Sequence, residues 1–182
     1  MPSKPHIALV GPMGSGKSSI GRALAARLNR AFVDLDRLIE EHAGASISLI
    51  FEMEGEPGFR RREREMLAER LAGSGAVIAC GGGIVLDADN RAALRAQSFV
   101  IHLVASVDEQ LARLARDRTR PLLQTDDRRA RLETLADHRD PLYAEVADLR
   151  FYPGDASAAC AARELAVQLD AASDTSWTKR ND

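Results

Sequence analysis

The sequence predicts an α/β fold in which helices cover both faces of a five-stranded parallel sheet, and three observations support this prediction. Short apolar runs of strand length alternate along the chain with segments of helical periodicity. A glycine-rich loop joins the first apolar run directly to a helical segment. The chain has 182 residues, which is enough for one such domain and too few for two of ordinary size.

The elements can be placed from these runs and from the residues that cap helices. The expected strands are His6–Val10, Ala31–Val33, Ala76–Cys80, Phe99–Val104 and Leu149–Tyr152. Ser106 and Glu109 form a capping box, and Asp87 is a plausible cap for the helical segment that follows it. We expect Pro141 to end the helix that runs up to Asp140, because a proline disfavours helical geometry in the residue before it.

Composition limits the partners of this chain. Its net charge of −2 creates no global field that would attract nucleic acid or an anionic membrane. Cys80 and Cys160 lack disulfide or metal-ligand spacing, so we expect two buried thiols in a reducing compartment. Since the first apolar run is also too short for a signal peptide, a cytoplasmic location is expected. The chain is expected to be a monomer. Residues 1–172 are expected to form the domain, and the polar residues 173–182 a disordered tail.

The loop after the first strand carries the most specific motif. Residues 11–18 read GPMGSGKS and match the P-loop pattern G-x-x-x-x-G-K-[ST] between a strand and a helix. Its glycines let backbone N–H groups approach phosphate oxygens, and Lys17 can reach the β- and γ-phosphates. A glycine-rich turn with an exposed lysine is the weaker alternative. The predicted ATP-binding residues in this motif are Gly14, Ser15, Gly16, Lys17, Ser18 and Ser19.

Two carboxylates follow the second strand, at the edge of the sheet where the P-loop also lies. One of Asp34 and Asp36 could hold Mg²⁺ through water, and the other could accept a proton from an attacking hydroxyl. The alternative is that Asp36 merely caps a helix beginning at Arg37, but capping would not require Asp34. The Ser18 hydroxyl is a second predicted Mg²⁺ ligand.

Two arginines are expected to point inward. Extending the aliphatic stripe of the helix around Pro57–Leu71 backwards places Glu63 and Arg60 on its buried face. Leu132 and Leu135 similarly lead to Arg139 in a later helix. A guanidinium pairs carboxylates and phosphates bidentately, so these arginines predict an anionic small ligand.

Two loops complete the predicted site. Gly81, Gly82 and Gly83 follow the third strand and permit backbone contact with a ligand, although a flexible turn is the alternative. The arginine-rich connection 116–127 between two helices resembles a mobile lid, and a solvated loop is its alternative.

Taken together, these motifs resemble those of shikimate kinase, a member of the nucleoside-monophosphate-kinase-like group of P-loop kinases. The resemblance covers about residues 7–152. Besides the P-loop, it rests on Asp34-Leu35-Asp36, on residues 44–63, on the three glycines, on Arg120-Pro121-Leu122-Leu123 and on Arg139-Asp140-Pro141-Leu142-Tyr143. It implies the three-layer P-loop fold of that group, with a lid, and ATP-dependent phosphorylation of the 3-hydroxyl of shikimate in the route to chorismate and the aromatic amino acids.

The resemblance also implies roles for individual residues. It assigns Asp36, Arg60, Arg139 and the glycines 81–83 to shikimate. Lys17 and the lid residue Arg120 are assigned to the phosphates, and these two residues with Asp36 are the expected catalytic groups. Arg116 is assigned to adenine, and Asp34 acts through a metal-bound water. Residues 153–157, where the adenine loop of the family falls, show no firm match.

Four other functions remain as alternatives. An adenylate-kinase-like enzyme would need a nucleoside-monophosphate site and a differently organised lid, and the sequence shows neither. A kinase resembling gluconate kinase would share the P-loop, but the inward arginines with the triple glycine disfavour it. A guanine-nucleotide switch would carry Asn-Lys-x-Asp, which the sequence lacks. A nucleotide-binding regulator without catalysis is disfavoured because every residue needed for transfer is present.

Overall fold

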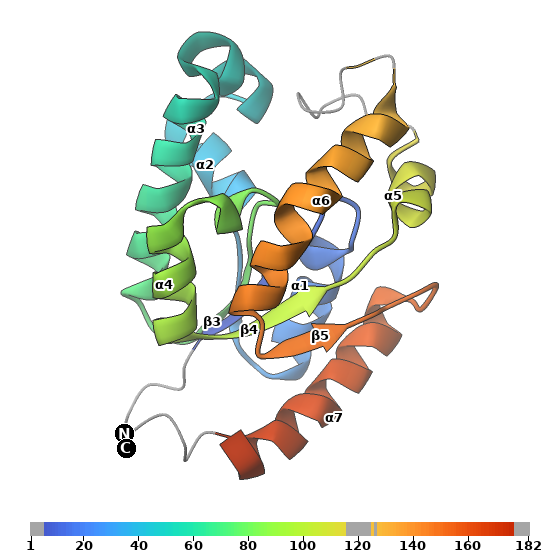
Figure 1. The fold of residues 1–182 in the computed structure, drawn as a ribbon. Helices are drawn as coiled ribbons and strands as arrows, with labels where there is room; N and C mark the ends of the chain where they lie inside the picture. Colours follow the sequence, from blue (N-terminus) through green and yellow to red (C-terminus); the bar gives the residue numbers. More distant parts are fainter. Residues whose placement is uncertain (1–5, 116–124, 126, 177–182) are drawn as a thin grey trace.

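The computed structural model describes residues 6–115, 125 and 127–176 of the chain. Five parallel strands form one sheet in the order β2-β3-β1-β4-β5 (Figure 1). Their bounds are β1 (His6–Val10), β2 (Ala31–Asp34), β3 (Ala76–Ala79), β4 (Ser98–Leu103) and β5 (Leu149–Phe151). The predicted α/β class and all five predicted strands are confirmed, with boundaries within one residue of those expected.

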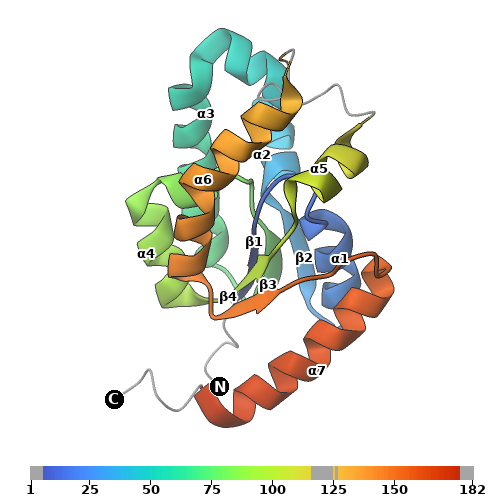
Figure 2. The same ribbon diagram turned by 45° about the vertical axis from the view of Figure 1, so that its right-hand side comes forward.

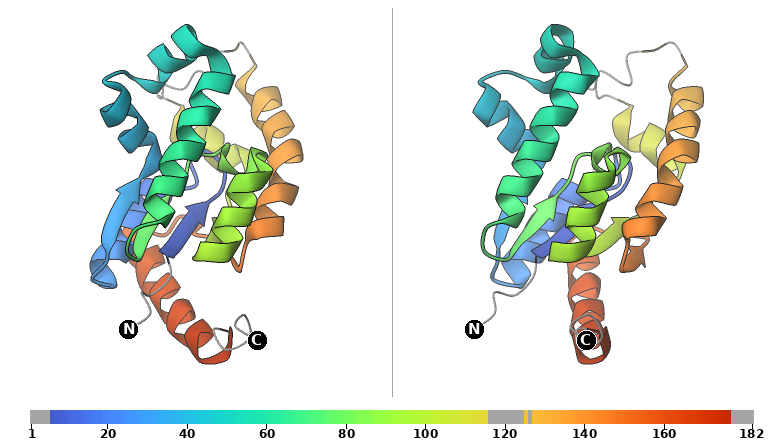
Figure 3. Two further views of the ribbon diagram at one scale, coloured as in Figure 1. Left: turned by 90° about the vertical axis from the view of Figure 1, so that its left-hand side faces the viewer. Right: turned by 60° about the vertical axis from the view of Figure 1, so that its left-hand side comes forward.

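Helices cover both faces of the sheet. They are α1 (Lys17–Arg27), α2 (Leu35–Ala43), α3 (Ile47–Leu71), the short 3₁₀ helix η1 (Ile84–Leu86), α4 (Ala88–Gln97), α5 (Val107–Leu114), α6 (Arg128–Val146) and α7 (Ala158–Ser176). Figure 3 shows α3, α4 and α6 side by side over one face. Helices α1 and α7 pack against each other and against the opposite face of the sheet.

The strands have a core on both faces, which explains their continuous apolar sequences. Along β1, Ala8 and Val10 belong to the core under α3, α4 and α6, whereas Ile7 and Leu9 belong to the core under α1 and α7. Parallel pairing brings the carboxyl ends of β1, β2 and β3 to one edge, so the loops that follow them meet there. The N-terminal halves of α3 and α6 extend beyond this same edge (Figure 2).

Local capping follows the sequence. Ser106 and Glu109 form the predicted capping box at the start of α5. Asp87 accepts hydrogen bonds from the backbone amides of Asp89 and Asn90 at the start of α4. The backbone of α7 continues to Ser176, past the boundary at residue 172 that composition suggested.

The prediction that Pro141 ends a helix is wrong. Helix α6 continues through Pro141 to Val146. Proline removes one backbone hydrogen bond and normally costs about 3 kcal/mol inside a helix. The next turn is nevertheless held in place because Tyr143 and Val146 are buried in the core. Tertiary packing therefore outweighs the local preference.

The two cysteines differ in environment. Cys80 is buried, as expected, but Cys160 is exposed, so the prediction of a second buried thiol is wrong. Helix α7 packs through Ala161, Ala162 and Leu165, which places Cys160 outside the contact. None of the helices in the described ranges is long and apolar enough to cross a membrane.

His102 on β4 makes stability depend on pH. Its side chain is 2% exposed, and burial together with the positive charges of Arg150 and Lys17 lowers its pKa to about 4. Between about pH 6.5 and 4 the unfolded chain therefore binds a proton that the folded chain does not, so stability falls as the pH falls. We expect this residue alone to remove about 2 kcal/mol between about pH 7.5 and pH 5.

Urea unfolding of the parent and of His102→Gln at both pH values measures this contribution. The variant should lose less stability on acidification, by about that amount. His42→Gln, a change at an exposed histidine of α2, controls for the loss of an imidazole as such. Equal acid destabilisation of the parent and His102→Gln would show that His102 is not the responsible group.

Candidate active site

Three cavities lie in a row along the carboxyl edge of the sheet. The arginine cavity has a volume of about 490 Å³ and is bordered by α2, α3, α6 and the loop after β3. The P-loop cavity, of about 220 Å³, shares Met13, Asp36 and Gly82 with it. The Arg113 cavity, of about 280 Å³, lies beside α5 and the loop after β5 and shares Gly16 and Ser19 with the P-loop cavity. The row can therefore hold one small molecule next to a longer one.

The P-loop is shaped by glycines whose conformations exclude side chains. Gly11 has a φ of 139°, and a Cβ there would lie 2.3 Å from the Leu103 carbonyl oxygen. Gly16 has a φ of 92° and starts α1 without a side-chain cap, so the first amides of α1 face the P-loop cavity. The Lys17 ammonium donates to the carbonyl oxygens of Gly11, at 2.8 Å, and Pro12, at 2.7 Å. The loop thus concentrates donors and one cation where a polyphosphate would bind.

The two carboxylates after β2 have different local roles. Asp34 ends β2 and caps α2 by accepting from the Arg37 amide at 3.4 Å. Asp36 lies in the first turn of α2 and borders both the arginine and the P-loop cavities. The residue that caps α2 is therefore Asp34 and not Asp36. Asp36 borders both cavities, so its carboxylate could contact a molecule in either one.

A charged side chain lies close to each of the three glycines after β3. A Cβ on Gly81 would lie 2.4 Å from Oε1 of Glu63, and a Cβ on Gly83 would lie 2.3 Å from the guanidinium of Arg60. At Gly82 the added carbon would stand 3.6 Å from the Arg139 guanidinium. Side chains at Gly81 and Gly83 would therefore displace residues that border the arginine cavity.

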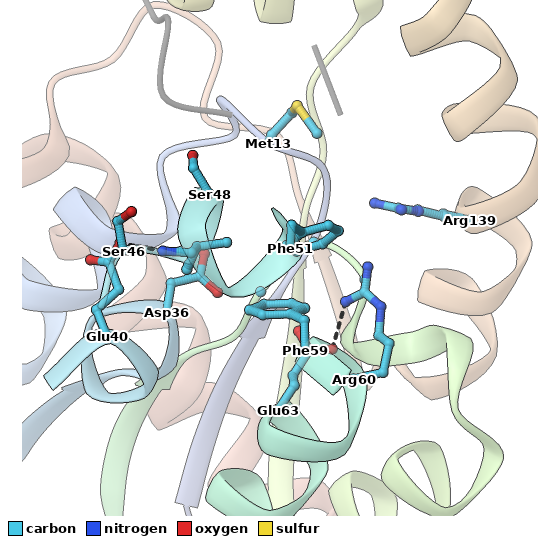
Figure 4. Close-up of a pocket in the computed structure, with 14 residues that line it drawn as sticks. Met13, Asp36, Glu40, Ser46, Ser48, Phe51, Phe59, Arg60, Glu63 and Arg139 are labelled. Carbon is cyan, nitrogen blue, oxygen red and sulfur yellow. Dashed lines mark hydrogen bonds and ion pairs between the residues drawn. The ribbon is translucent and has the colours of Figure 1, made fainter. Parts of the chain in front are cut away.

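Glu63 is a buried acid in this cavity. Its side chain is 1% exposed, and Oε2 accepts from the Arg60 guanidinium at 2.6 Å (Figure 4). Burial raises the pKa of Glu63 to about 7, an effect opposed by Arg60 and Arg139 and reinforced by Asp36. Its Oε1 has no hydrogen-bond partner among the described residues. The sequence placed Glu63 on the buried face, but its position beside Asp36 required the fold.

Arg139 is a buried cation in the wall of the arginine cavity. It is 6% exposed, and no carboxylate within the described ranges forms an ion pair with it. Burial lowers the pKa of Arg139, Tyr143 partly offsets this, and Arg60 lowers it further. Arg60, by contrast, is paired with both Glu56 and Glu63. Both guanidinium groups border the same cavity as Asp36, Glu40 and Glu63 (Figure 4). Arg139 forms no ion pair with these carboxylates, so it is the cation on this wall that a bound anion could pair with.

Arg113, on α5, is a residue of this region that the sequence analysis did not single out. It donates to the carbonyl oxygens of Gly14, at 3.1 Å, and Gly154, at 2.6 Å, and so bridges the P-loop to the loop after β5. The residues 153–156 line the same cavity. Arg116 and Arg120 lie outside the described residues. The only sequence feature that marks Arg113 is its position as a basic residue in the last turn of the helix after β4.

Oxygen ligands for a cation are present in the P-loop cavity. The hydroxyl of Ser18 and the carboxylates of Asp34 and Asp36 line it together. The part of the chain that the structure describes contains no cluster of three or more His, Cys, Asp or Glu suited to hold a metal alone. The oxygen donors of Ser18, Asp34 and Asp36 fit Mg²⁺, which usually binds one or two protein oxygens together with phosphates and waters.

Every predicted site residue within the described ranges borders one of the three cavities. The P-loop residues, Asp34 and Asp36 surround the P-loop cavity, with Ser15 in the Arg113 cavity. Arg60, the glycines 81–83 and Arg139 border the arginine cavity, together with Asp36. Residues far apart in sequence therefore meet along this edge of the sheet.

Comparisons with known proteins agree with this arrangement. The family model described as shikimate kinase matches residues 13–170. A shikimate kinase of Stenotrophomonas maltophilia is 51% identical over 97% of this chain and 96% of the relative. The structure of a shikimate kinase from Acinetobacter baumannii in complex with shikimate aligns with a TM-score of 0.90 and 43% identity, covering 94% of this chain and 95% of that one.

A more distant structure separates fold from family. A gluconokinase from Sinorhizobium meliloti aligns over 93% of this chain and 97% of its own length, with a TM-score of 0.57 and 18% identity. That likeness extends to the fold alone. The match of the shikimate kinase model over most of the chain, together with relatives of about half-identical sequence, establishes that the chain belongs to the shikimate kinase family.

Proposed function

We propose that this chain transfers the γ-phosphoryl group of ATP to the 3-hydroxyl of shikimate, giving shikimate 3-phosphate and ADP. The observation that carries the proposal is Arg139, a buried cation without an acidic partner in the described ranges, beside Arg60 in a cavity that adjoins the P-loop. Shikimate supplies one carboxylate for these arginines and hydroxyls for the rest of the cavity. The complex of the A. baumannii relative with shikimate supports the same substrate. The reaction belongs to chorismate and aromatic amino acid biosynthesis.

In the transfer step, the shikimate hydroxyl oxygen forms a bond to the γ-phosphorus while the bond from that phosphorus to the ADP oxygen breaks. Asp36 takes the hydroxyl proton, a role that suits its place between the two cavities. Lys17 stabilises the charge on the β- and γ-phosphate oxygens, and Arg120 adds a second cation when the lid, residues 116–127, closes. Catalysis is therefore mainly positioning and charge stabilisation.

Ser18 and Asp34 would hold Mg²⁺, Ser18 through its hydroxyl and Asp34 through a bound water. When bound there, the cation would neutralise part of the phosphate charge. On the nucleotide side, Gly14, Ser15, Gly16 and Ser19 contribute with the rest of the P-loop. Arg113 and residues 153–156 enclose the base, and Arg116 contributes from the lid.

The remaining features of the protein are proposals of the same kind. We assign residues 1–172 to one catalytic domain and residues 173–182 to a tail. The chain acts as a monomer and needs neither nucleic acid nor a membrane. We place the reaction in the cytoplasm, where ATP is available and where an exposed thiol such as Cys160 stays reduced.

A coupled ADP-release assay tests the function directly. Purified protein with ATP and Mg²⁺ is offered shikimate, gluconate and nucleoside monophosphates in parallel. We expect rapid ADP release when shikimate is the acceptor, and not with gluconate or nucleoside monophosphates. Preference for gluconate would favour the related sugar-acid kinase, and nucleotide binding without turnover of any acceptor would favour a regulator.

A further inference from the structure

Tyr143 is buried directly behind the arginine cavity. It lies one helical turn after Arg139 on α6 and is fully buried. Its hydroxyl donates to the carbonyl oxygen of Gly82, which borders the cavity. The same phenolic oxygen lies within hydrogen-bonding reach of the Arg139 guanidinium. One hydroxyl therefore connects two groups that reach the cavity from different elements.

The direction of these hydrogen bonds follows from chemistry. A hydroxyl has one hydrogen to donate and lone pairs to accept with, whereas a guanidinium only donates and a carbonyl only accepts. Burial raises the pKa of Tyr143, so the phenol keeps its proton at neutral pH. Arg139 therefore donates to the phenol, and the phenol donates to Gly82.

The neighbouring ring does not compete for this hydroxyl. His102 packs against Tyr143 with ring centroids 5.0 Å apart and an interplanar angle of 37°. Because its pKa is lowered to about 4, His102 is neutral at pH 7 and places no second cation beside Arg139. The other charged groups that act on Tyr143 are Asp140 and Glu63. Arg139 is thus the cation that this phenol serves.

We propose that Tyr143 is a positioning residue for the acceptor site, which sets the Arg139 guanidinium and the Gly82 backbone in one arrangement for the substrate carboxylate and ring. The inference rests on the proposed shikimate kinase activity. A phenylalanine would fill the same volume, so the hydroxyl contributes hydrogen bonds and not packing. Without it, Gly82 and Arg139 each lose a buried partner, and the arginine is free to adopt orientations that no longer face the ligand.

Tyr143→Phe is the direct test. We expect the KM and the dissociation constant for shikimate to rise about twofold to twelvefold, the range for the net loss of one hydrogen bond. The KM for ATP should change less than the KM for shikimate, because Tyr143 reaches the P-loop cavity only through Gly82, whereas it reaches the arginine cavity through both Gly82 and Arg139. Tyr152→Phe removes the other tyrosine hydroxyl of the chain, an exposed one bonded to Glu109, and should leave shikimate affinity unchanged.

A double-mutant cycle separates positioning from a general loss of stability. In an Arg139→Ala background, Tyr143→Phe should raise the shikimate KM much less than in the parent, since the arginine it positions is gone. Equal effects in both backgrounds would show that Tyr143 does not act through Arg139. Unchanged shikimate affinity in a folded Tyr143→Phe would overturn the proposal.

A second measurement does not require a Tyr143 variant to fold. The chain has two tyrosines, so protein labelled with fluorotyrosine gives two ¹⁹F signals, which Tyr152→Phe assigns. Saturating shikimate should shift the Tyr143 signal, and a static signal would contradict the proposal. If the parent enzyme releases ADP with shikimate, these results bear on Tyr143 alone. If it does not, the proposed function itself is wrong.

Discussion

Lys17→Ala is expected to lower turnover at least about a hundredfold, the cost of one lost donor to transition-state charge. Lys17 opens α1 and borders the P-loop cavity, where its ammonium already lies against the carbonyl oxygens of Gly11 and Pro12. It is the only lysine among the described residues, so no neighbouring lysine can replace it. Steady-state ADP release with shikimate and ATP measures the effect.

Two controls show whether a loss of turnover in Lys17→Ala reflects catalysis and not unfolding. Thermal unfolding should show that Lys17→Ala keeps most of the parent stability, because the lysine is partly exposed and the loop conformation is set by its glycines. Arg22→Ala, a cation of the same helix that packs on Phe32 and not on the cavity, should retain turnover. Near-normal turnover in purified, folded Lys17→Ala would remove the catalytic role of the P-loop lysine.

The strands were predictable because both faces of a central parallel strand are buried. Every residue of β1 and β3 is buried, and apart from His6 their sequences are continuous apolar runs that local pattern identifies. Pro141 shows where local reasoning fails. The packing of Tyr143 and Val146, which keeps α6 helical beyond the proline, depends on a sheet and helices distant in sequence.

Much of the site was also predictable, for two reasons. Loops that follow parallel strands must meet at one edge, which brings the P-loop, Asp36 and Gly82 together. A charged residue that continues an aliphatic stripe must point inward, which located Arg60 and Arg139. Neither rule finds Arg113, because its function depends on a loop after β5.

The position of that loop follows from the strand order. Strand β4 lies between β1 and β5, and Arg113, on the helix after β4, bridges the loops on both sides of it. The sequence did not predict the role of Tyr143 for a similar reason. A tyrosine in a helix reads as a core residue, and only the fold places its hydroxyl against Gly82. Both cases require contacts between elements that sequence periodicity does not encode.

The second large effect concerns the arginine pair. Arg60→Ala and Arg139→Ala should each weaken shikimate binding by about 1.5–3 kcal/mol, the range for hydrogen bonds to charged groups. Arg139→Ala should weaken shikimate binding more than Arg60→Ala. Its positive charge has no acidic partner in the described part of the chain, whereas that of Arg60 is already partly neutralised by Glu56 and Glu63. Titration calorimetry with shikimate and, separately, with ATP gives both affinities.

The nucleotide side provides a matched control. Arg113→Ala removes an arginine of comparable size from the other end of the row of cavities, where it contacts Gly14 and Gly154. It should weaken ATP binding and leave shikimate affinity nearly unchanged. Arg60→Ala and Arg139→Ala should do the reverse. If all three variants lost affinity for both ligands, the differences would reflect general damage and not separate subsites.

The double variant and a modified ligand test whether one carboxylate is shared. Arg60→Ala/Arg139→Ala should lose less than the sum of the single losses, because two groups that clamp one partner are not independent. A shikimate analogue with a neutral amide in place of the carboxylate should bind weakly to the parent and lose little more in either variant. If the neutral analogue were as sensitive to these changes as shikimate, the arginines would contact another part of the ligand. The carboxylate clamp, and with it the main structural argument for shikimate over other acceptors, would then be wrong.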